Sequence, residues 1–139
     1  MVNGFPLIHV PEIKDDIGDT GSYRDARYKR FKATSLTTAF NRQINKTVHM
    51  SRKAFPSANI VLFHFPSFFR TVKKNTKAFG FSTIDEGCLL LDIATIQYSP
   101  TDSCELATDI DAFFFFDQLH FSGEAHQYFG RSLFSQLPR

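Results

Sequence analysis

The sequence has no apolar run approaching the ~18 residues that a membrane-spanning helix needs, which excludes such a helix. It also lacks a glycine-rich phosphate loop, a G-x-S-x-G motif and a C-x-x-C pair. The opening residues show no basic region, apolar stretch or small-residue cleavage site of a secretory signal. We therefore expect either an intracellular protein or a chain whose beginning is missing.

Cysteine is scarce, with Cys88 and Cys104 on either side of a mostly apolar stretch. If oxidised, the pair would close a loop of a length that stabilises a fold by about 3 kcal/mol, and it would indicate an oxidising compartment. Two unpaired thiols in a cytosolic protein explain the sequence equally well. The redox state stays open at this level.

The length and composition indicate one globular domain over residues 1–139, with 42% apolar and 22% charged residues. The net charge of +2 is unevenly spread, because the segment from Tyr23 to Lys53 contains a single acid, Asp25. Its basic residues are Arg24, Arg27, Lys29, Arg30, Lys32, Arg42, Lys46, Arg52 and Lys53. Such a segment is either the solvated face of a helix or a surface for anionic membranes or nucleic acid.

Three continuous apolar runs indicate strands buried on both faces, which is typical of a parallel sheet. They are Phe5 to Val10, Asn59 to Phe65 and Ala112 to Phe116. Between the first two we expect a long helix, from about Asp25 to Arg52. Its apolar residues recur every four positions and are expected to face the core; they are Leu36, Phe40, Ile44 and Val48.

The remaining segments complete an alternation of strands and helices. We expect a short helix from Pro66 to near Gly80, then mostly loop over 81–111. A final helix is expected from Ser122, which can cap it, to about Leu137. This order predicts a three-layer α/β/α sandwich around a parallel sheet. With only about three strands, the domain is expected to be incomplete.

The strongest chemical signal is the pair Asp117 and His120, placed directly after the phenylalanine run. Functional groups of open parallel sheets collect beyond the carboxyl ends of strands. A carboxylate three residues before a histidine can accept a hydrogen bond from Nδ1–H and leave Nε2 free to take a proton. The alternative is that Asp117 caps a loop and His120 is an exposed turn residue.

The segment from Phe116 to Gly130 resembles the last block of the SGNH hydrolases, or GDSL lipases and esterases, in which Asp-x-x-His-Pro-Thr follows an aromatic residue. Phe121 replaces the usual proline and Ser122 the usual threonine. Segments 7–13, 39–44, 59–65 and 75–81 resemble earlier parts of the family in order and spacing. Secreted members often carry cysteines where Cys88 and Cys104 stand.

The resemblance implies an ester hydrolase of the lipase, lysophospholipase or acyltransferase type, with Asp117 and His120 catalytic. It also implies a secreted or periplasmic parent protein. The family's Gly-Asp-Ser nucleophile block and its oxyanion blocks are not evident. Gly18-Asp19-Thr20-Gly21-Ser22 superficially resembles the first block, but it follows a charged turn and has the composition of a surface loop.

The histidines outside the pair have simpler interpretations. His9 and His64 lie in apolar runs and are expected in the core, whereas His126 is expected to pack or to face solvent. A metal site from Asp117, His120, His126 and His64 matches no established ligand spacing. We expect no cofactor.

These observations lead to three hypotheses. In the first, the chain holds His and Asp of a Ser-His-Asp triad, acts on an ester or lipid at or near a membrane surface, and is inactive without the missing N-terminal part of its domain. In the second, it is a truncated, non-catalytic remnant. In the third, which we favour least, it is a basic binding module; no nucleic acid partner is expected.

Overall fold

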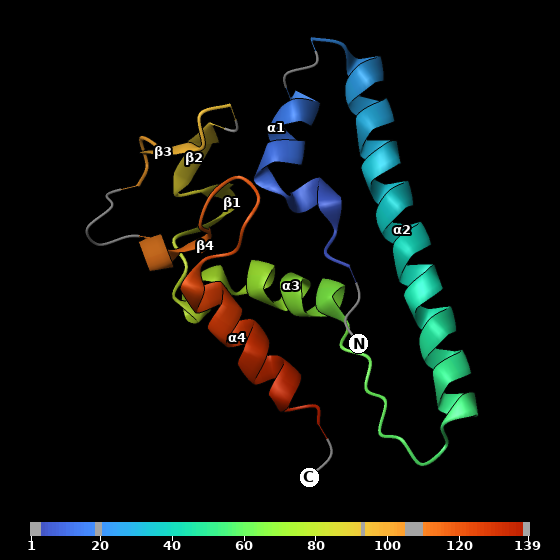
Figure 1. The fold of residues 1–139 in the computed structure, drawn as a ribbon. Coiled ribbons are helices and arrows are strands. Elements are labelled where there is room, and N and C mark those ends of the chain that lie inside the picture. Colours follow the sequence, from blue (N-terminus) through green and yellow to red (C-terminus); the bar gives the residue numbers. More distant parts are fainter. Residues whose placement is uncertain (1–3, 19–20, 93, 105–109, 138–139) are drawn as a thin grey trace.

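The computed structural model describes residues 4–18, 21–92, 94–104 and 110–137 (Figure 1). The helices are α1 (Pro11–Gly18), α2 (Tyr23–Ala54), α3 (Phe65–Lys74) and α4 (Gly123–Phe134). The strands are β1 (Thr83–Gly87), β2 (Leu89–Asp92), β3 (Gln97–Pro100) and β4 (Phe113–Phe115). Short 3-10 turns cover Leu7–His9, Thr76–Phe79 and Ile110–Ala112.

The strands form two small sheets on one side of the molecule (Figure 1). β1 and β4 pair in parallel, with Thr83 opposite Phe113 and Gly87 opposite Phe115. β2 and β3 form an antiparallel pair. The fold is therefore mixed α/β with one parallel pair among the described residues, and the strand expected at 112–116 is confirmed as β4.

The strand expected from Phe5 to Val10 is wrong, because this segment holds a 3-10 turn and leads into α1. Its backbone is bound by side chains of α2: Gly4 N–H donates to Asn41 Oδ1 at 2.7 Å, and Leu7 N–H donates to Thr37 Oγ1 at 3.2 Å. Pro6 has no N–H to offer to a neighbouring strand. The apolar side chains are partly buried without a sheet.

The strand expected from Asn59 to Phe65 is also wrong. The segment is extended coil with a single bridge at Phe63, and Phe65 already begins α3. Ile60 O accepts two hydrogen bonds from Arg52, at 3.0 and 2.8 Å, so a side chain occupies an acceptor that a ladder would use. Phe63 and Phe65 are buried in the core, as expected.

The expectation of a mostly irregular segment over 81–111 is wrong as well, because β1, β2, β3 and a 3-10 turn lie there. β2 and β3 are joined by a turn in which the Asp92 carboxylate accepts hydrogen bonds from Ala94 N–H and the Thr95 hydroxyl. The residues of β3 are exposed along its length, so no apolar alternation marks it. Side-chain capping of a turn, rather than periodicity, defines this hairpin.

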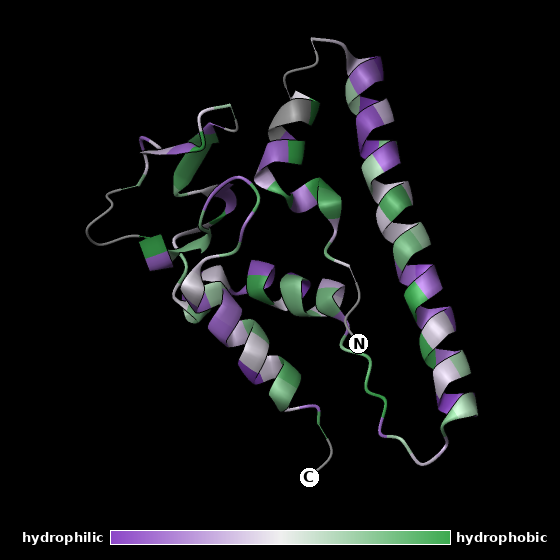
Figure 2. Ribbon diagram, viewed as in Figure 1, coloured by the Kyte–Doolittle hydropathy of each residue, from purple (hydrophilic) through white to green (hydrophobic). Residues whose placement is uncertain are grey.

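The long helix is confirmed, and it extends slightly beyond the predicted bounds as α2. It packs on α1 and on the turn at Leu7–His9, along one side of the molecule (Figure 1). Its expected core stripe is only partly right: Val48 is buried, whereas 63% of Leu36 and 53% of Phe40 are exposed. Figure 2 accordingly shows hydrophobic and hydrophilic positions alternating along the whole of α2.

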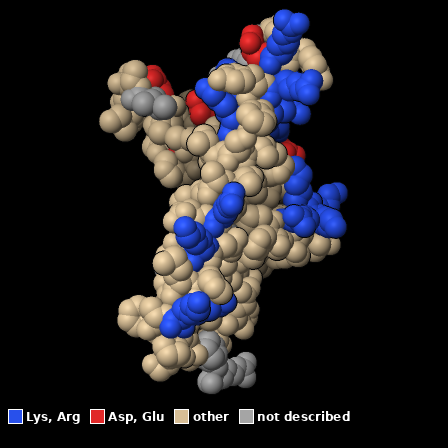
Figure 3. Space-filling model, turned by 90° about the vertical axis from the view of Figure 1, so that its right-hand side faces the viewer, with Lys and Arg blue, Asp and Glu red and all other residues tan. Residues whose placement is uncertain are grey.

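The basic residues of this segment lie mostly in solvent. Lys29 is half-buried and the other eight are exposed. Blue side chains are spread over the face that α2 turns outward in Figure 3, with few acidic ones among them. This confirms the solvated helix face and leaves a partner for it untested.

The two remaining helices follow the predictions closely. α3 begins where His64 Nδ1 accepts from Ser67 N–H at 3.3 Å, and Gly80 adopts the left-handed conformation at the end of the following turn. α4 begins after Ser122, whose hydroxyl accepts from Ala125 N–H at 3.2 Å. Its cap is buried together with Ala125.

Phenylalanine dominates the core between α3, α4 and β4. Phe5 makes edge contacts with several of these rings, at centroid distances of 4.7 to 5.9 Å. The buried cluster comprises Phe63, Phe65, Phe69, Val72, Phe81, Ile84, Phe114, Phe115 and Ala125. Edge-to-face contacts of this kind add to the stabilisation from burial.

A second, smaller core forms around a disulfide bond between Cys88 and Cys104. Leu89 and Phe113 are buried beside it. The sulfurs are therefore paired in the structure, which decides between the two states that the sequence left open. None of the described helices has the length and apolar character required to cross a lipid bilayer.

Candidate functional site

The candidate site is the loop that follows β4. Its two ends are held together, because Phe116 N–H donates to His120 O at 2.8 Å and Ser122 N–H donates to Phe114 O at 3.0 Å. Phe115 and Phe121 form an antiparallel bridge between these bonds. Residues 117–120 thus form a tight turn at the carboxyl end of β4, where a parallel sheet collects functional groups.

Gly87, at the end of β1, brings the neighbouring strand against this turn. A Cβ added at Gly87 would lie 2.8 Å from Asp117 Cα and closer still to the Asp117 carbonyl group. Glycine is required here because any side chain would meet backbone that cannot move aside. The absence of a side chain at Gly87 therefore fixes how closely β1 supports Asp117.

Asp117 is completely buried, and both oxygens of its carboxylate accept hydrogen bonds. Oδ1 accepts from the backbone N–H groups of Leu119 and His120, at 2.8 and 2.7 Å. Burial alone would raise the pKa of Asp117, but the hydrogen bonds from the His120 ring and from both N–H groups outweigh burial and lower the pKa. The carboxylate is therefore ionised at neutral pH, inside the protein.

His120 is oriented by this carboxylate. Its Nδ1 lies 2.8 Å from Asp117 Oδ2 and 3.0 Å from Oδ1. Because an ionised carboxylate can only accept hydrogen bonds, Nδ1 carries the ring proton and donates the hydrogen bond to Asp117. The opposite edge of the ring, which carries Nε2, is open. The His120 side chain is 64% exposed, and no described residue hydrogen-bonds to Nε2.

Both interpretations of the pair describe part of this geometry. Asp117 does close a turn, since it accepts from N–H groups two and three residues ahead. It also fixes the His120 ring in the tautomer whose Nε2 is an acceptor. The catalytic role predicted for both residues is compatible with the arrangement and stays a prediction.

Gln118 is a third residue of this loop that makes structural contacts, and the sequence did not predict them. Gln118 Oε1 accepts from Leu91 N–H of β2 at 2.7 Å, and Gln118 O accepts from Glu12 N–H of α1 at 3.2 Å. The turn is therefore held from two sides. Nothing in the sequence marks Gln118, since both bonds depend on elements distant in the chain.

The other residues considered earlier do not join the pair. Thr20 lies outside the described residues, and Ser22 sits at the start of α2, in the connection from α1 at the top of Figure 1, away from the β4 loop. His64 is exposed and its Nδ1 lies 2.8 Å from Ser67 Oγ, so the core position expected for it is wrong. His9 is half-buried, with its ring centroid 5.2 Å from that of Phe69.

His126 faces solvent, as expected, and its Nδ1–H donates to Ser122 O at 2.9 Å. Within the described part of the chain, no three His, Cys, Asp or Glu side chains gather in a way that would hold a metal ion. The Asp117 carboxylate holds the His120 imidazole in one orientation, and Nε2 of this ring can take a proton from a hydroxyl brought to it and return that proton later.

Comparison with known proteins bears on this geometry. No curated protein matches the chain closely enough to count as a relative. The family model described as GDSL-like lipase/acylhydrolase matches residues 8–133, which includes the β4 loop, Asp117 and His120. The match extends over most of the sequence, and the chain belongs to the GDSL-like lipase/acylhydrolase family.

Proposed function

We propose that the protein is an ester hydrolase in which His120 is the general base and Asp117 orients it. The observation that carries the proposal is the 2.8 Å contact between a buried, ionised carboxylate and Nδ1 of an exposed histidine, at the carboxyl end of a parallel strand. Family membership supports the same reaction class. The proposed substrate is a carboxylic ester, in particular an acyl ester of a lipid.

The proposed reaction needs a serine hydroxyl beside Nε2. His120 Nε2 takes the hydroxyl proton as the serine oxygen attacks the ester carbonyl, and the carbonyl oxygen becomes an oxyanion. The protonated ring then gives its proton to the leaving alcohol, and an acyl-serine remains. Water repeats the sequence and releases the acid. Throughout, Asp117 stabilises the imidazolium that forms twice in each turnover.

We further propose that the serine comes from another segment of polypeptide, which completes a three-layer α/β/α domain. Three observations support this. The sequence has no Gly-Asp-Ser block, and no described hydroxyl is bound to His120 Nε2. Leu36 and Phe40 of α2 are exposed although they continue the stripe that ends in buried Val48, so a completed domain has an apolar face to cover.

The first experiment treats the purified 139-residue chain with a serine-directed fluorophosphonate probe. We expect no labelling, because no hydroxyl of the described residues is bonded to Nε2 of the fixed histidine. Stoichiometric labelling of Ser22 or Thr20, located by mass spectrometry, would contradict the proposal and assign a nucleophile within this chain. The chain would then be active by itself.

The second experiment supplies the missing block by co-expressing a segment that carries Gly-Asp-Ser and measures hydrolysis of a chromogenic short-chain ester. His120→Ala should lower kcat/KM at least about 100-fold, because general-base catalysis is removed. His126→Ala is the matched control and should keep the activity, since its exposed ring contacts the Ser122 carbonyl and Phe121 and is not bonded to Asp117 or His120 in the described structure. Equal activity of His120→Ala and the restored protein would refute the assignment.

The non-catalytic remnant is the second candidate, and the same absence of a bound hydroxyl at Nε2 favours it. It predicts that no Gly-Asp-Ser segment restores hydrolysis, although the chain folds cooperatively in urea unfolding. Restored turnover would exclude it. The two candidates are therefore separated by a single complementation assay.

A further inference from the structure

Beyond the β4 loop, a second polar constellation surrounds a cavity of about 320 Å³ between α1, α2, α3 and β1. Three basic side chains line it, and each belongs to a different helix: Lys14 to α1, Arg30 to α2 and Lys73 to α3. One acidic side chain, Asp85 of β1, and His9 also line the cavity. Three separate helices thus each contribute one basic side chain to the lining of this cavity.

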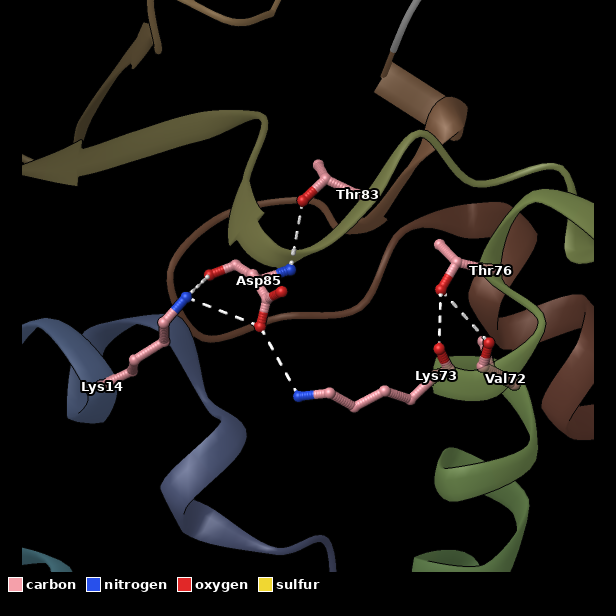
Figure 4. A network of polar contacts seen from close by, with 6 residues as sticks. All are labelled: Lys14, Val72, Lys73, Thr76, Thr83 and Asp85. Atoms are coloured by element: carbon pink, nitrogen blue, oxygen red, sulfur yellow. Dashed lines mark hydrogen bonds and ion pairs between the residues drawn. The ribbon is translucent and has the colours of Figure 1, made fainter.

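The single carboxylate is shared between two of these cations (Figure 4). Lys14 Nζ lies 3.5 Å from Asp85 Oδ1, and Lys73 Nζ lies 3.7 Å from the same oxygen. Lys14 also donates to the backbone carbonyl of Asp85 at 3.0 Å. Both ion pairs are long, and among the described side chains that line the cavity three cations stand against one anion, an excess of two positive charges.

The electrostatic surroundings of His9 also carry net positive charge. Its pKa is lowered, first by burial and then by Lys73 and Lys14, with Asp85 acting in the opposite direction. The charged groups that face the ring therefore include two cations and one anion. A neutral His9 adds a hydrogen-bonding edge without further charge.

We infer that this cavity binds a phosphate group, either free or carried by a small organic molecule. A phosphate dianion matches the excess of two positive charges, and its tetrahedral oxygens suit donors that arrive from three directions. In the free protein the Asp85 carboxylate occupies the place of the anion. Its side chain is 58% exposed, so it can turn towards solvent when phosphate enters.

The position of the cavity relates it to the candidate site without depending on it. A neighbouring cavity of about 360 Å³ shares Lys14 and Asp85 and extends to Gln118, the residue after Asp117. A phosphate held by Lys14 and Lys73 would therefore lie one cavity away from the turn that carries the histidine. The inference concerns binding, and it stands whether or not the chain hydrolyses esters.

The test follows the imidazole proton signals of His9 by NMR in the intact chain. Inorganic phosphate is titrated at constant ionic strength against sodium chloride. We expect a saturable change and an increase in the pKa of His9, because a bound dianion favours the protonated ring. No saturable change, or the same change with chloride, would overturn the inference even without any variant.

Variants assign the binding to this cavity. Lys73→Gln should weaken phosphate binding at least tenfold, whereas Lys74→Gln removes the same charge from the next residue and should leave binding unchanged. Asp85→Asn should tighten binding, because the competing carboxylate is lost; a purely structural Lys14–Asp85–Lys73 cluster predicts no gain. Equal losses in Lys73→Gln and Lys74→Gln would show general charge attraction and refute the site.

Two further titrations identify the source of the phosphate. Glycerol 3-phosphate tests a headgroup without acyl chains, and phosphatidic acid vesicles test a membrane surface. Binding of inorganic phosphate and glycerol 3-phosphate supports a site for a single group. Binding of vesicles alone would overturn the inference in favour of adsorption through the basic face of α2. No arm measures hydrolysis, so a failure here leaves the proposed function untouched.

Discussion

Asp117 is a buried carboxylate that receives hydrogen bonds from two backbone N–H groups and one imidazole. Because these bonds lower its pKa below the ordinary value of 3.8, the folded protein favours the ionised form more than the unfolded chain does. The resulting stabilisation is fully present above that ordinary pKa. It is lost as the pH falls through the lower pKa of the folded state.

Asp117→Asn should therefore destabilise the fold at neutral pH by about 1–3 kcal/mol, since the amide loses charge-assisted bonds at a fully buried position. The difference from wild type should shrink below pH 3.8, where the carboxylate of the unfolded wild-type chain begins to be protonated and folding gains less from the ionised form. Urea unfolding at neutral and acidic pH measures the loss of stability and its decrease with falling pH. Asp102→Asn, at an exposed turn, is the control; a pH-independent penalty at Asp117 would contradict this account.

At the scale of elements, the parallel pairing of β1 with β4 depends on the missing side chain at Gly87. Gly87→Ala should cost about 1–3 kcal/mol, because the added Cβ meets the Asp117 backbone and the strands must separate. Gly130→Ala is the matched control. No atom lies within 4 Å of an added Cβ there, and alanine suits the interior of α4 better than glycine does. Thermal unfolding followed by circular dichroism compares the two.

The stripe on α2 provides a second comparison within one element. Val48 is 2% exposed and Leu36 is 63% exposed, although both belong to the stripe that the sequence predicts as core. Val48→Ala should cost about 2 kcal/mol, whereas Leu36→Ala should change the free energy of unfolding by less than about 0.5 kcal/mol. A large loss at Leu36 in this chain would show that the stripe is covered along its whole length.

The elements also show which sequence signals predict structure. Capping residues and periodicity located α2, α3 and α4, because helices are stabilised by contacts between near neighbours in sequence. Apolar runs predicted buried rings correctly at Phe63 and Phe65, but a strand also needs a continuous backbone ladder, and neither 59–64 nor 5–10 belongs to a strand of the described sheets. The pair Asp117 and His120 was predictable because it is local. Gly87 and Gln118 were not, because their partners come from other elements.

At the scale of the whole molecule, the disulfide closes the base of the hairpin formed by β2 and β3. Cys88 lies between β1 and β2, Cys104 follows β3, and the two cysteines are 16 residues apart in the sequence. Replacing both by alanine should lower the free energy of unfolding by about 3 kcal/mol, because the unfolded chain regains the freedom of that loop.

Urea unfolding with and without a reductant measures this loss. The wild-type chain should lose a similar amount when it is reduced, and the double alanine variant should be insensitive to the reductant. If reduction leaves the wild-type stability unchanged, the cross-link does not contribute to the fold. The two cysteines would then act as ordinary small core residues.

The ring-packed core has a practical consequence for spectroscopy. The sequence contains 17 phenylalanines and no tryptophan, and the buried cluster places many of these rings in fixed, asymmetric surroundings. Phenylalanine fine structure in the near-ultraviolet circular dichroism therefore reports on native packing without any label. A tryptophan placed at Phe116, whose ring lies 5.6 Å from that of Tyr98, would be the sole indole in the protein. Its emission would report on the turn beside β4 alone.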